Sequence, residues 1–455
     1  MALKKNDIET ITITGMTAEG NGVGRICDMA VFVPASAPGD VLSVRIVKVL
    51  KNYAFGKIEK IMQPSKDRVE PDCPVFAQCG GCAYRHLSYE AELIVKEQRV
   101  RDAVTRIAGL SEELINPIVG AASSGRYRNK AQLPFAVGKG KTLEMGFFAP
   151  HSHRVVACGD CLLQPTVFRA AMDAVKKWAQ ECSPSVYEEE GHKGLLRHLY
   201  LRLGEKTNEV MVCLVANGEQ VPCENRLVEL LCENVPGIKS VVLNVNTERT
   251  NVIVGKKCRT LWGKESITDE LCSLHFSLSP RSFYQVNRAQ AERLYRLAAD
   301  FAKLTKEDVL LDLYCGTGTI GLSMAHLVKE VIGVEVVKQA VRDAGVNAQN
   351  NGITNARFLC ADAAQAAAQL NEQGVKPDVV IIDPPRKGCA PGLIGTIAAL
   401  SPKRVVYVSC DPATLSRDLK LFAQEGYRTL AVTPVDMFPR TAHVEAVALL
   451  DRNKA

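Results

Sequence analysis

The C-terminal part of the chain alternates between short apolar runs and helical segments, and this pattern constrains the fold more than any other feature. The apolar runs lie at residues 309–314, 331–334, 357–361, 379–382 and 405–408, each followed by a helical segment. Strands that alternate with helices at this spacing form a parallel, doubly wound sheet, which is an α/β fold. Two last β runs, 430–435 and 444–450, leave no room for a helix between them. We expect them to pair as an antiparallel hairpin at the sheet edge.

A glycine-rich loop follows the first of these strands. Residues 312–321 read Asp-Leu-Tyr-Cys-Gly-Thr-Gly-Thr-Ile-Gly. Glycines let a ligand approach the backbone, and a helix N-terminus offers unpaired N–H groups. The spacing also fits a dinucleotide site, but Asp312 at the strand end and Glu335 at the end of the next strand resemble the S-adenosylmethionine site of class I methyltransferases. Asp362, at the end of the third strand, is placed to bind adenine or to cap a helix. A purely structural glycine turn is the alternative.

Asp383 and Cys410 follow the fourth and fifth strands. Both therefore lie at carboxyl ends of parallel strands, where doubly wound sheets bind substrates. Methyltransferases that act on exocyclic nitrogens often carry Asp-Pro-Pro and then an aromatic residue. This chain has Arg386 at the aromatic position and a cysteine one strand later. The combination favours methylation of a ring carbon.

The chemistry of uracil explains why a cysteine belongs there. Its C5 is a poor nucleophile, but a thiolate that adds to C6 turns the ring into an enolate whose C5 can attack a methyl group. A base must then remove the C5 proton so that the thiolate can leave. Glu445 and His443, near the last strand, are the candidate bases. The structural alternatives are a buried strand-end role for Cys410 and an ion pair for Glu445.

The N-terminal region reads as a small β domain. Residues 8–62 contain about five short β runs separated by glycine-rich turns, which predicts a barrel of OB-like size. Its second half is basic. Between residues 41 and 68 there are only two acidic residues but seven basic ones, which are Arg45, Lys48, Lys51, Lys57, Lys60, Lys66 and Arg68. The whole chain carries a net charge of +6. The stretch is either a solvated face or a surface that binds nucleic-acid phosphates.

The middle of the chain is less regular. Residues 88–110 show helical spacing, with apolar positions at Ala91, Leu93, Ile94, Val100, Val104 and Ile107. Residues 115–275 show mixed strands and turns with weak periodicity. No run approaches the about 18 apolar residues of a membrane span, and we expect a cytoplasmic protein. Most of the 16 cysteines should then be small buried hydrophobes rather than disulfides.

Together these motifs resemble the RNA uracil-5-methyltransferases over essentially the whole chain. The closest branch resembles the 23S rRNA enzymes that carry an N-terminal TRAM domain and an iron–sulfur cluster. Residues 20–40 are similar to the TRAM module, and residues 282–287, Ser-Phe-Tyr-Gln-Val-Asn, to the segment that opens the methyltransferase domain. The resemblance implies an OB-like TRAM barrel, a mixed α+β central domain and a class I methyltransferase domain. Their expected bounds are 1–62, 63–275 and 276–455, with helix 88–110 packed against the catalytic domain.

The resemblance also implies roles for single residues. Cys410 corresponds to the nucleophile, Glu445 to the base, and Phe283 to the residue that packs against the target base. The positions that match cofactor contacts are Gln285, Tyr314, Glu335, Asp362 and Asp383.

A cluster of cysteines is a candidate metal site. Cys73, Cys79 and Cys82 recur in the iron–sulfur branch with a fourth cysteine far downstream, for which Cys161 fits the family context better than Cys158. Four thiolates can hold a [4Fe–4S] cluster or zinc, and spacing alone does not decide between them. The resemblance favours the [4Fe–4S] cluster.

The resemblance implies an enzyme that transfers a methyl group from S-adenosyl-L-methionine to C5 of a uridine in 23S rRNA. The alternative is the same chemistry on a tRNA uridine. A radical S-adenosylmethionine enzyme would need Cys-x3-Cys-x2-Cys, whereas Cys73 and Cys79 are separated by five residues. An RNA-binding chaperone with an inactive methyltransferase fold would not need Cys410 and Glu445. We expect a monomer that binds RNA and no membrane.

Overall fold

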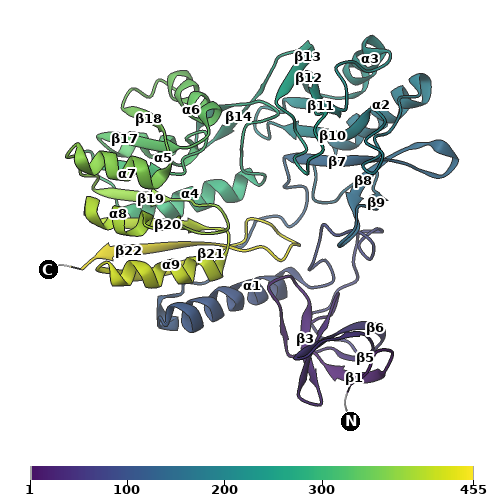
Figure 1. Ribbon diagram of the computed structural model, residues 1–455, viewed down its shortest axis with the longest axis horizontal. Coiled ribbons are helices and arrows are strands. Elements are labelled where there is room, and N and C mark those ends of the chain that lie inside the picture. The colour runs from purple at the N-terminus through teal and green to yellow at the C-terminus, as the bar shows by residue number, and fades with distance from the viewer. Residues whose placement is uncertain (1–2, 454–455) are drawn as a thin grey trace.

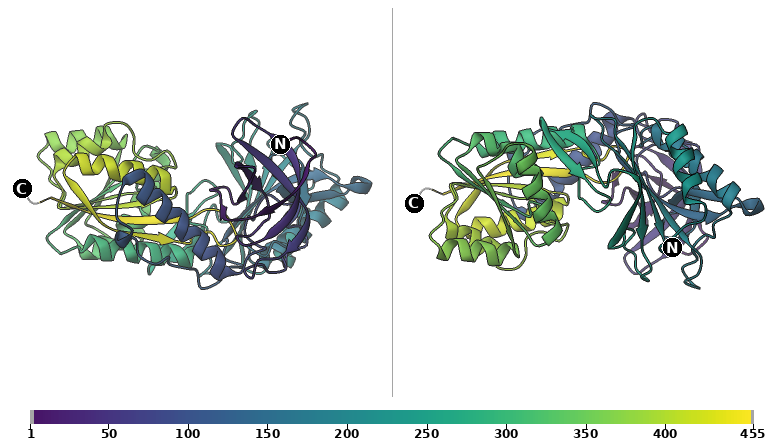
Figure 2. Two further views of the ribbon diagram at one scale, coloured as in Figure 1. Left: turned by 90° about the horizontal axis from the view of Figure 1, so that it is seen from below. Right: turned by 90° about the horizontal axis from the view of Figure 1, so that it is seen from above.

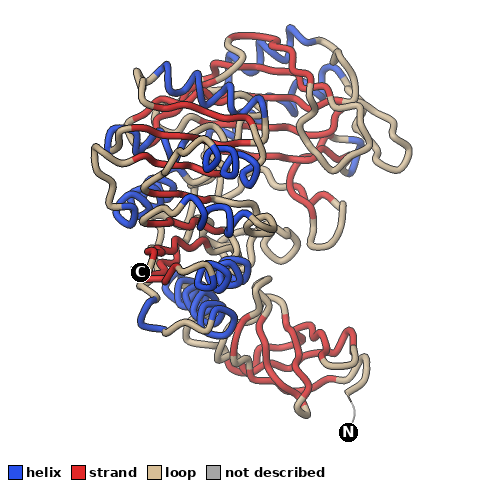
Figure 3. The backbone as a smooth tube through the Cα atoms, turned by 60° about the vertical axis from the view of Figure 1, so that its left-hand side comes forward, coloured by secondary structure: helices blue, strands red, loops and turns tan. Residues whose placement is uncertain are grey.

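The computed structural model describes residues 3–453, which form an N-terminal barrel, a central sheet and a C-terminal α/β unit (Figure 1). The N-terminal barrel stands apart as a body of strands and loops, whereas helices flank the C-terminal sheet (Figure 3). Among the described residues, no helix is long and apolar enough to cross a membrane.

The N-terminal barrel has six strands, one more than the sequence suggested. They are β1 (Ile8–Thr12), β2 (Gly15–Met16), β3 (Gly22–Ile26), β4 (Met29–Val33), β5 (Val41–Val49) and β6 (Tyr53–Gln63). The strand order is β1-β5-β6-β4-β3-β2. The sheet curls until β3 meets β1, and a Cβ at Gly24 would collide with the carbonyl oxygen of Thr12. Alternate side chains such as Val31, Val33 and Val44 fill the interior.

The central part, whose topology the sequence left open, is a mixed seven-stranded sheet with the order β13-β12-β11-β10-β7-β8-β9. Its strands are β7 (Lys130–Val137), β8 (Leu143–Phe148), β9 (Val155–Ala157), β10 (Leu196–Leu203), β11 (Val210–Ala216), β12 (Ile238–Val245) and β13 (Lys257–Gly263). Two helices, α2 (Val167–Cys182) and α3 (Glu224–Asn234), supply apolar residues to the core of this sheet. A short hairpin, β14 (Ile267–Leu271) and β15 (Leu274–Leu278), follows.

The C-terminal part is the expected doubly wound sheet. Its strands are β16 (Val309–Leu313), β17 (Glu330–Glu335), β18 (Ala356–Cys360), β19 (Val379–Ile382), β20 (Arg404–Ser409), β21 (Tyr427–Val435) and β22 (Glu445–Arg452). Strands β16 to β20 are parallel, in the order β18-β17-β16-β19-β20. The predicted antiparallel hairpin is confirmed, and β22 lies between β20 and β21.

Two layers of helices cover this sheet. They are α4 (Arg288–Ala302), α5 (Thr319–Met324), α6 (Lys338–Asn350), α7 (Ala363–Glu372), α8 (Leu393–Leu400) and α9 (Pro412–Gln424). Successive strand residues face opposite layers: Leu310 packs in one core with residues of α4 and α5, and Leu311 packs in the other with residues of α7, α8 and α9.

Helix α1 (Tyr89–Ala103) continues into a π-helical turn, η1 (Val104–Ala108), and ends at Gly109 in the left-handed region. It crosses from the N-terminal barrel to the C-terminal unit, where α1 and η1 contact α9 (Figures 1 and 2). The predicted helix is confirmed, but not all of its apolar positions are buried. Ile94 and Ile107 are exposed, whereas Glu92 and Lys96 are buried.

Candidate functional site

Five of the predicted site residues lie where the five parallel strands end. They are Tyr314, Glu335, Asp362, Asp383 and Cys410. Because β16 to β20 pair in parallel, these positions share one edge of the sheet. This is the edge at which doubly wound sheets bind ligands.

Glu445 reaches the same edge from the opposite direction. It is the first residue of β22, which runs antiparallel to β20, and Ser409 pairs with Ala446. The register therefore sets Glu445 beside Cys410 although 35 positions separate them in the sequence. The side chain of Glu445 is buried.

The electrostatics show that these groups share one environment. Burial, with a contribution from Asp383, raises the pKa of Glu445 to about 8. Burial also raises the pKa of Asp383 to about 7. The pKa of the Cys410 thiol is raised by burial and by the carboxyl groups of Glu445 and Asp383, and lowered by Arg386. A thiol among acids, with one guanidinium nearby, can be shifted toward thiolate by any added positive charge.

Two carboxylates, Asp312 and Glu335, make different contacts with the glycine loop. Asp312 accepts a hydrogen bond from the N–H of Gly321 at 2.9 Å through Oδ2, while its buried Oδ1 has no partner among residues 3–453. Burial raises the pKa of Asp312 to about 7. Glu335 accepts from the N–H groups of Gly316 at 3.2 Å and Val337 at 2.8 Å. Asp312 thus keeps an unused acceptor at the loop, and Glu335 holds the loop against the second strand.

Asp362 is a helix cap in this structure. Its side chain accepts from the N–H groups of Ala364 and Gln365 at the start of α7, and it is exposed. An exposed carboxylate that caps a helix keeps acceptor capacity on its solvent side. The cap and the predicted contact with a ligand are therefore compatible.

The segment before α4 presents Phe283 and Gln285. Phe283 is 61% exposed, whereas Gln285 is buried. The carbonyl oxygen of Phe283 accepts from Thr317 of the glycine loop at 3.5 Å, and that of Gln285 accepts from Asn129 of the central part at 2.9 Å. These contacts tie the segment to the glycine loop and to the central sheet.

Sequence reasoning missed the residues that hold the loop between β21 and β22. Lys96 of α1 is fully buried and donates to Glu92 and to Asp436 of this loop, both at 2.7 Å. The same ammonium donates to the carbonyl oxygen of Phe438 at 3.1 Å. Lys96 and Asp436 are 340 positions apart in the sequence, so no local sequence pattern could pair them. The one sequence signal for this cluster was the four-residue spacing of Glu92 and Lys96, which is typical of an ion pair on a helix.

Arg440 links this loop to the cysteine region. Its carbonyl oxygen accepts from the N–H groups of Ala83 at 2.8 Å and Tyr84 at 3.1 Å, directly after Cys82. Its guanidinium donates to the carbonyl oxygen of Leu87 at 2.9 Å. The backbone of Arg440 has φ 69°, in the left-handed region. The segment after Cys82 and the loop that leads to Glu445 are therefore one hydrogen-bonded unit.

Two residues considered as alternatives have other contacts. Arg386 donates to a ring nitrogen of His443 at 3.3 Å. Burial and this guanidinium lower the pKa of His443 to about 4, so its ring is neutral. The thiol of Cys389 donates to the hydroxyl of Tyr407 at 3.8 Å, and burial raises its pKa to about 12.

The cysteine cluster surrounds a cavity at the edge of the central part. Five thiols line it: Cys73, Cys79, Cys82, Cys158 and Cys161. Within residues 3–453, no group of three or more His, Cys, Asp or Glu side chains is arranged as ligands of a single metal ion. The structure thus brings together the four predicted thiols and adds Cys158 as a fifth.

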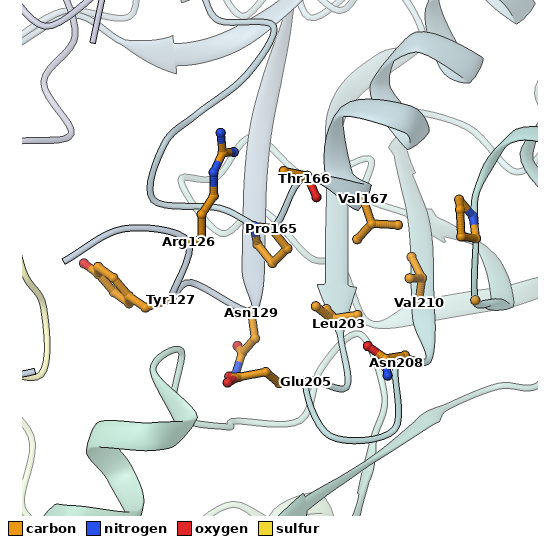
Figure 4. A pocket seen from close by; sticks show the side chains of 12 residues that line it. Arg126, Tyr127, Asn129, Pro165, Thr166, Val167, Leu203, Glu205, Asn208 and Val210 are labelled. Carbon is orange, nitrogen blue, oxygen red and sulfur yellow. The ribbon is translucent and has the colours of Figure 1, made fainter. Parts of the chain in front are cut away.

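A larger cavity, of about 520 Å³, lies in the central part away from the strand ends (Figure 4). Its lining includes Arg126, Asn129, Thr166, Glu205 and Asn208. It contains none of the predicted site residues.

The fold and the strand-edge site define a class I methyltransferase. The chain is similar to the crystal structure of the tRNA (uracil-54, C5)-methyltransferase of Pyrococcus abyssi in complex with S-adenosyl-L-homocysteine. The TM-score is 0.79 and the identity 29%, covering 97% of this chain and 99% of that one.

The sequence comparisons specify the family further. A family model described as tRNA (uracil-5-)-methyltransferase matches residues 249–453, and a TRAM domain model matches residues 3–58. An RNA methyltransferase of Halalkalibacterium halodurans is 44% identical over 99% of this chain and 98% of its own length. One of Caldanaerobacter subterraneus is 46% identical over 97% of both chains. The chain belongs to the S-adenosylmethionine-dependent RNA (uracil-C5-)-methyltransferase family, and its N-terminal barrel is a TRAM domain.

Proposed function

We propose that this enzyme methylates C5 of a specific uridine in 23S rRNA through a covalent adduct between Cys410 and C6 of the uracil. The observation that carries the proposal is the pairing of a thiol and a buried carboxyl at one strand edge. Cys410 ends β20, Glu445 begins β22, and the register sets them side by side. A nucleophile and a base within one site are what addition, methyl transfer and elimination require.

The residues divide the reaction between them. Cys410 adds to C6, so that C5 becomes the nucleophile. S-adenosylmethionine would supply the methyl group and a positive charge, and such a charge favours the ionised form of nearby carboxyls. Glu445, mostly protonated in the free enzyme because burial raises its pKa to about 8, then takes the C5 proton as a carboxylate. The electron pair of the C5–H bond re-forms the C5–C6 double bond, and the thiolate leaves.

The remaining strand-edge residues, together with Gln285 from the segment before α4, are proposed as the cofactor site. They are Gln285, Tyr314, Glu335, Asp362 and Asp383. The buried Oδ1 of Asp312, which has no partner within the described residues, supports a polar ligand at the glycine loop, because an unpaired buried acceptor is costly. The exposed ring of Phe283 is available to pack against the target base.

We further propose that Cys73, Cys79, Cys82 and Cys161 hold a [4Fe–4S] cluster. Four thiolates on one cavity suit such a cluster, in which each binds a different iron. A zinc ion would instead draw all four sulfurs to about 2.3 Å from one point.

Methylation of a tRNA uridine is the second candidate. The similar Pyrococcus abyssi enzyme is a tRNA (uracil-54, C5)-methyltransferase. The cysteine set and its resemblance to the 23S rRNA branch favour rRNA. The test is transfer of a labelled methyl group to unmodified 23S rRNA and to unmodified tRNA, with the product uridine mapped in each. Labelling of tRNA alone would replace the 23S proposal, and labelling of neither would overturn uracil methylation.

A further inference from the structure

Three aromatic side chains lie together on the outer face of the TRAM barrel. Phe32 comes from β4, and Tyr53 and Phe55 come from the neighbouring strand β6. Phe32 pairs directly with Phe55 in the parallel register, and Tyr53 is two positions away on the same face. The ring centroids of Phe32 lie 5.4 Å from Tyr53 and 5.7 Å from Phe55, and those of Tyr53 and Phe55 lie 5.7 Å apart.

These rings are not part of the barrel core. The interior is filled by the alternate residues of the same strands, such as Val31, Val33 and Ala54. Tyr53 is 38% exposed, and Phe32 and Phe55 are partly exposed. The three rings thus form a partly exposed apolar patch outside the barrel core, and exposed apolar patches are a common feature of binding surfaces.

Three basic residues lie on strands at or beside the aromatic cluster. Lys48 of β5 pairs with Phe55 across the antiparallel register, and Lys57 follows Phe55 on the same face of β6. Arg25 of β3 is exposed at the other side of β4. Within the described residues, neither Lys48 nor Lys57 forms a salt bridge. The acidic Glu59 on this strand is already paired with Arg45 at 2.7 Å.

We propose that Phe32, Tyr53 and Phe55 form a stacking platform for two or three bases of a single-stranded RNA segment, with Lys48, Lys57 and Arg25 binding the flanking phosphates. Stacking on aromatic rings needs a free base face, which unpaired RNA offers and a duplex does not. The inference rests on the proposed RNA substrate and goes beyond it. It requires that the substrate presents unpaired nucleotides to the barrel while the target uridine is at the strand edge.

The test is binding of the full-length protein to a fluorescein-labelled uridine oligonucleotide of about 12 nucleotides, a length that spans one such domain. The variants Phe32→Ala, Tyr53→Ala and Phe55→Ala should each weaken binding about 5- to 100-fold. Affinity for a blunt RNA duplex of the same length should change less than about twofold. The matched control is Met62→Ala, also on β6 and 56% exposed but outside the aromatic cluster, which should keep its affinity.

A second measurement separates stacking from a structural role of the rings. Phe32→Tyr and Phe55→Tyr keep an aromatic face and should keep the affinity, whereas Phe32→Leu and Phe55→Leu keep apolar bulk and should lose it. Tyr53→Trp, made together with Trp262→Phe to remove the exposed background indole, should show fluorescence quenched by the single strand. Unchanged affinity of the alanine variants, or no quenching, would overturn the platform and leave a surface for another partner.

These measurements distinguish failure of the stacking platform from failure of the proposed function. If no RNA accepts a methyl group while the Tyr53→Trp signal is still quenched, the proposed reaction fails and the platform stands. If methyl transfer proceeds normally in the alanine variants and their affinity is unchanged, the platform fails and the reaction stands.

Discussion

Burial of Glu445 opposes the ionised form in which this residue would act as the base. Burial raises its pKa from the ordinary value of 4.5 to about 8, so the folded protein holds this proton more tightly than the unfolded chain. The stability that follows is fully present below about pH 4.5 and is lost as the pH rises through about 8. Glu445→Gln should flatten this dependence. Thermal unfolding from pH 5 to pH 9 tests it, and a variant with the wild-type slope would contradict the raised pKa.

Cys410→Ala and Glu445→Gln should fail in different ways. Cys410→Ala cannot form the adduct, so RNA that contains 5-fluorouracil should not be trapped. Glu445→Gln keeps the thiol but lacks the base for elimination, so a covalent protein–RNA species should accumulate on natural RNA. Each should lower turnover by at least about 10²-fold, as expected for loss of a positioned catalytic group. Denaturing gels of the two reactions, beside the wild type, separate these outcomes.

The control for the nucleophile is Cys389→Ala. Its thiol binds Tyr407 and its pKa is raised to about 12, so this variant should still be trapped by fluorinated RNA. Trapping by Cys410→Ala would instead point to another cysteine. Normal turnover by Glu445→Gln would place the base elsewhere. His443 would then be the nearest candidate in sequence, although its low pKa makes it a weak base.

At the level of elements, α1 is held by a buried charge cluster as well as by apolar residues such as Ala91 and Val100. Lys96 lies between Glu92 and Asp436 with no side chain of the three exposed. Among the described residues, Lys96 is the one cation that contacts both carboxyls, so Lys96→Met leaves them without it, and removal of one partner from a buried pair costs about 3–5 kcal/mol. The same change removes one of the contacts that hold the Asp436 loop, beside the hydrogen bond from Tyr89 at 2.7 Å, and should lower turnover. Urea unfolding and initial rates measure the two effects.

The matched control on the same helix is Arg106→Met. Arg106 pairs with Asp102 at 3.3 Å, but its side chain is 77% exposed. An exposed pair contributes about 0–1 kcal/mol, so this variant should stay close to the wild type in stability and rate. Equal effects of the Lys96 and Arg106 substitutions would refute the buried cluster as the anchor.

Helix α1 also shows where reading the sequence succeeds and where it fails. Its existence and its bounds follow from periodicity, and Gly109 ends it as expected for a left-handed position. The buried face follows only in part. Ala91, Val100 and Val104 are buried in apolar cores, but Glu92 and Lys96 are buried against charged partners. Periodic leucines and isoleucines predict burial only when the surface that meets the helix is apolar, and Ile94 remains 69% exposed.

The basic stretch of the TRAM barrel is only partly free to bind phosphates. Arg68 pairs with Asp40 at 2.6 Å, and Arg45 pairs with Glu59. Lys48, Lys51 and Lys57 form no salt bridge within the described part of the chain. Replacing these three lysines by glutamine should weaken RNA binding and reduce the slope of log affinity against log salt by up to about three counterions. An unchanged slope would identify the stretch as a solvated face.

For the whole molecule, the strand-edge residues could be predicted because parallel strands bring their carboxyl ends together by topology alone. Asp383 and Cys410 needed only a correct strand assignment. The contacts that hold Glu445 could not be predicted, because they join α1, the cysteine segment and the loop after β21 across more than 300 positions. Such contacts leave no local pattern in one sequence. The central sheet was missed for the same reason, since its strands pair out of order around α2 and α3.

The contact between the cysteine segment and Arg440 gives the cysteine cavity a consequence for the whole enzyme. Ala83 and Tyr84, directly after Cys82, donate to the carbonyl oxygen of Arg440, which lies five residues before Glu445. A disordered cysteine segment would release this acceptor and loosen the loop. Metal binding at the cysteines should therefore stabilise the barrel, α1 and the catalytic loop together rather than one region alone.

Anaerobically purified protein should be brown and contain about four irons per chain. Cys79→Ser and Cys161→Ser should lose iron, lower the melting temperature and lose solubility or RNA affinity, since these thiols order the segment that contacts Arg440. Cys158→Ser is the matched control, because Cys158 lines the same cavity but is not among the proposed ligands, and it should keep its iron. Iron analysis, visible absorbance and thermal unfolding of the four proteins measure this. Zinc without iron in the wild type would overturn the cluster. Loss of iron in Cys158→Ser but not in Cys161→Ser would instead exchange the fourth ligand.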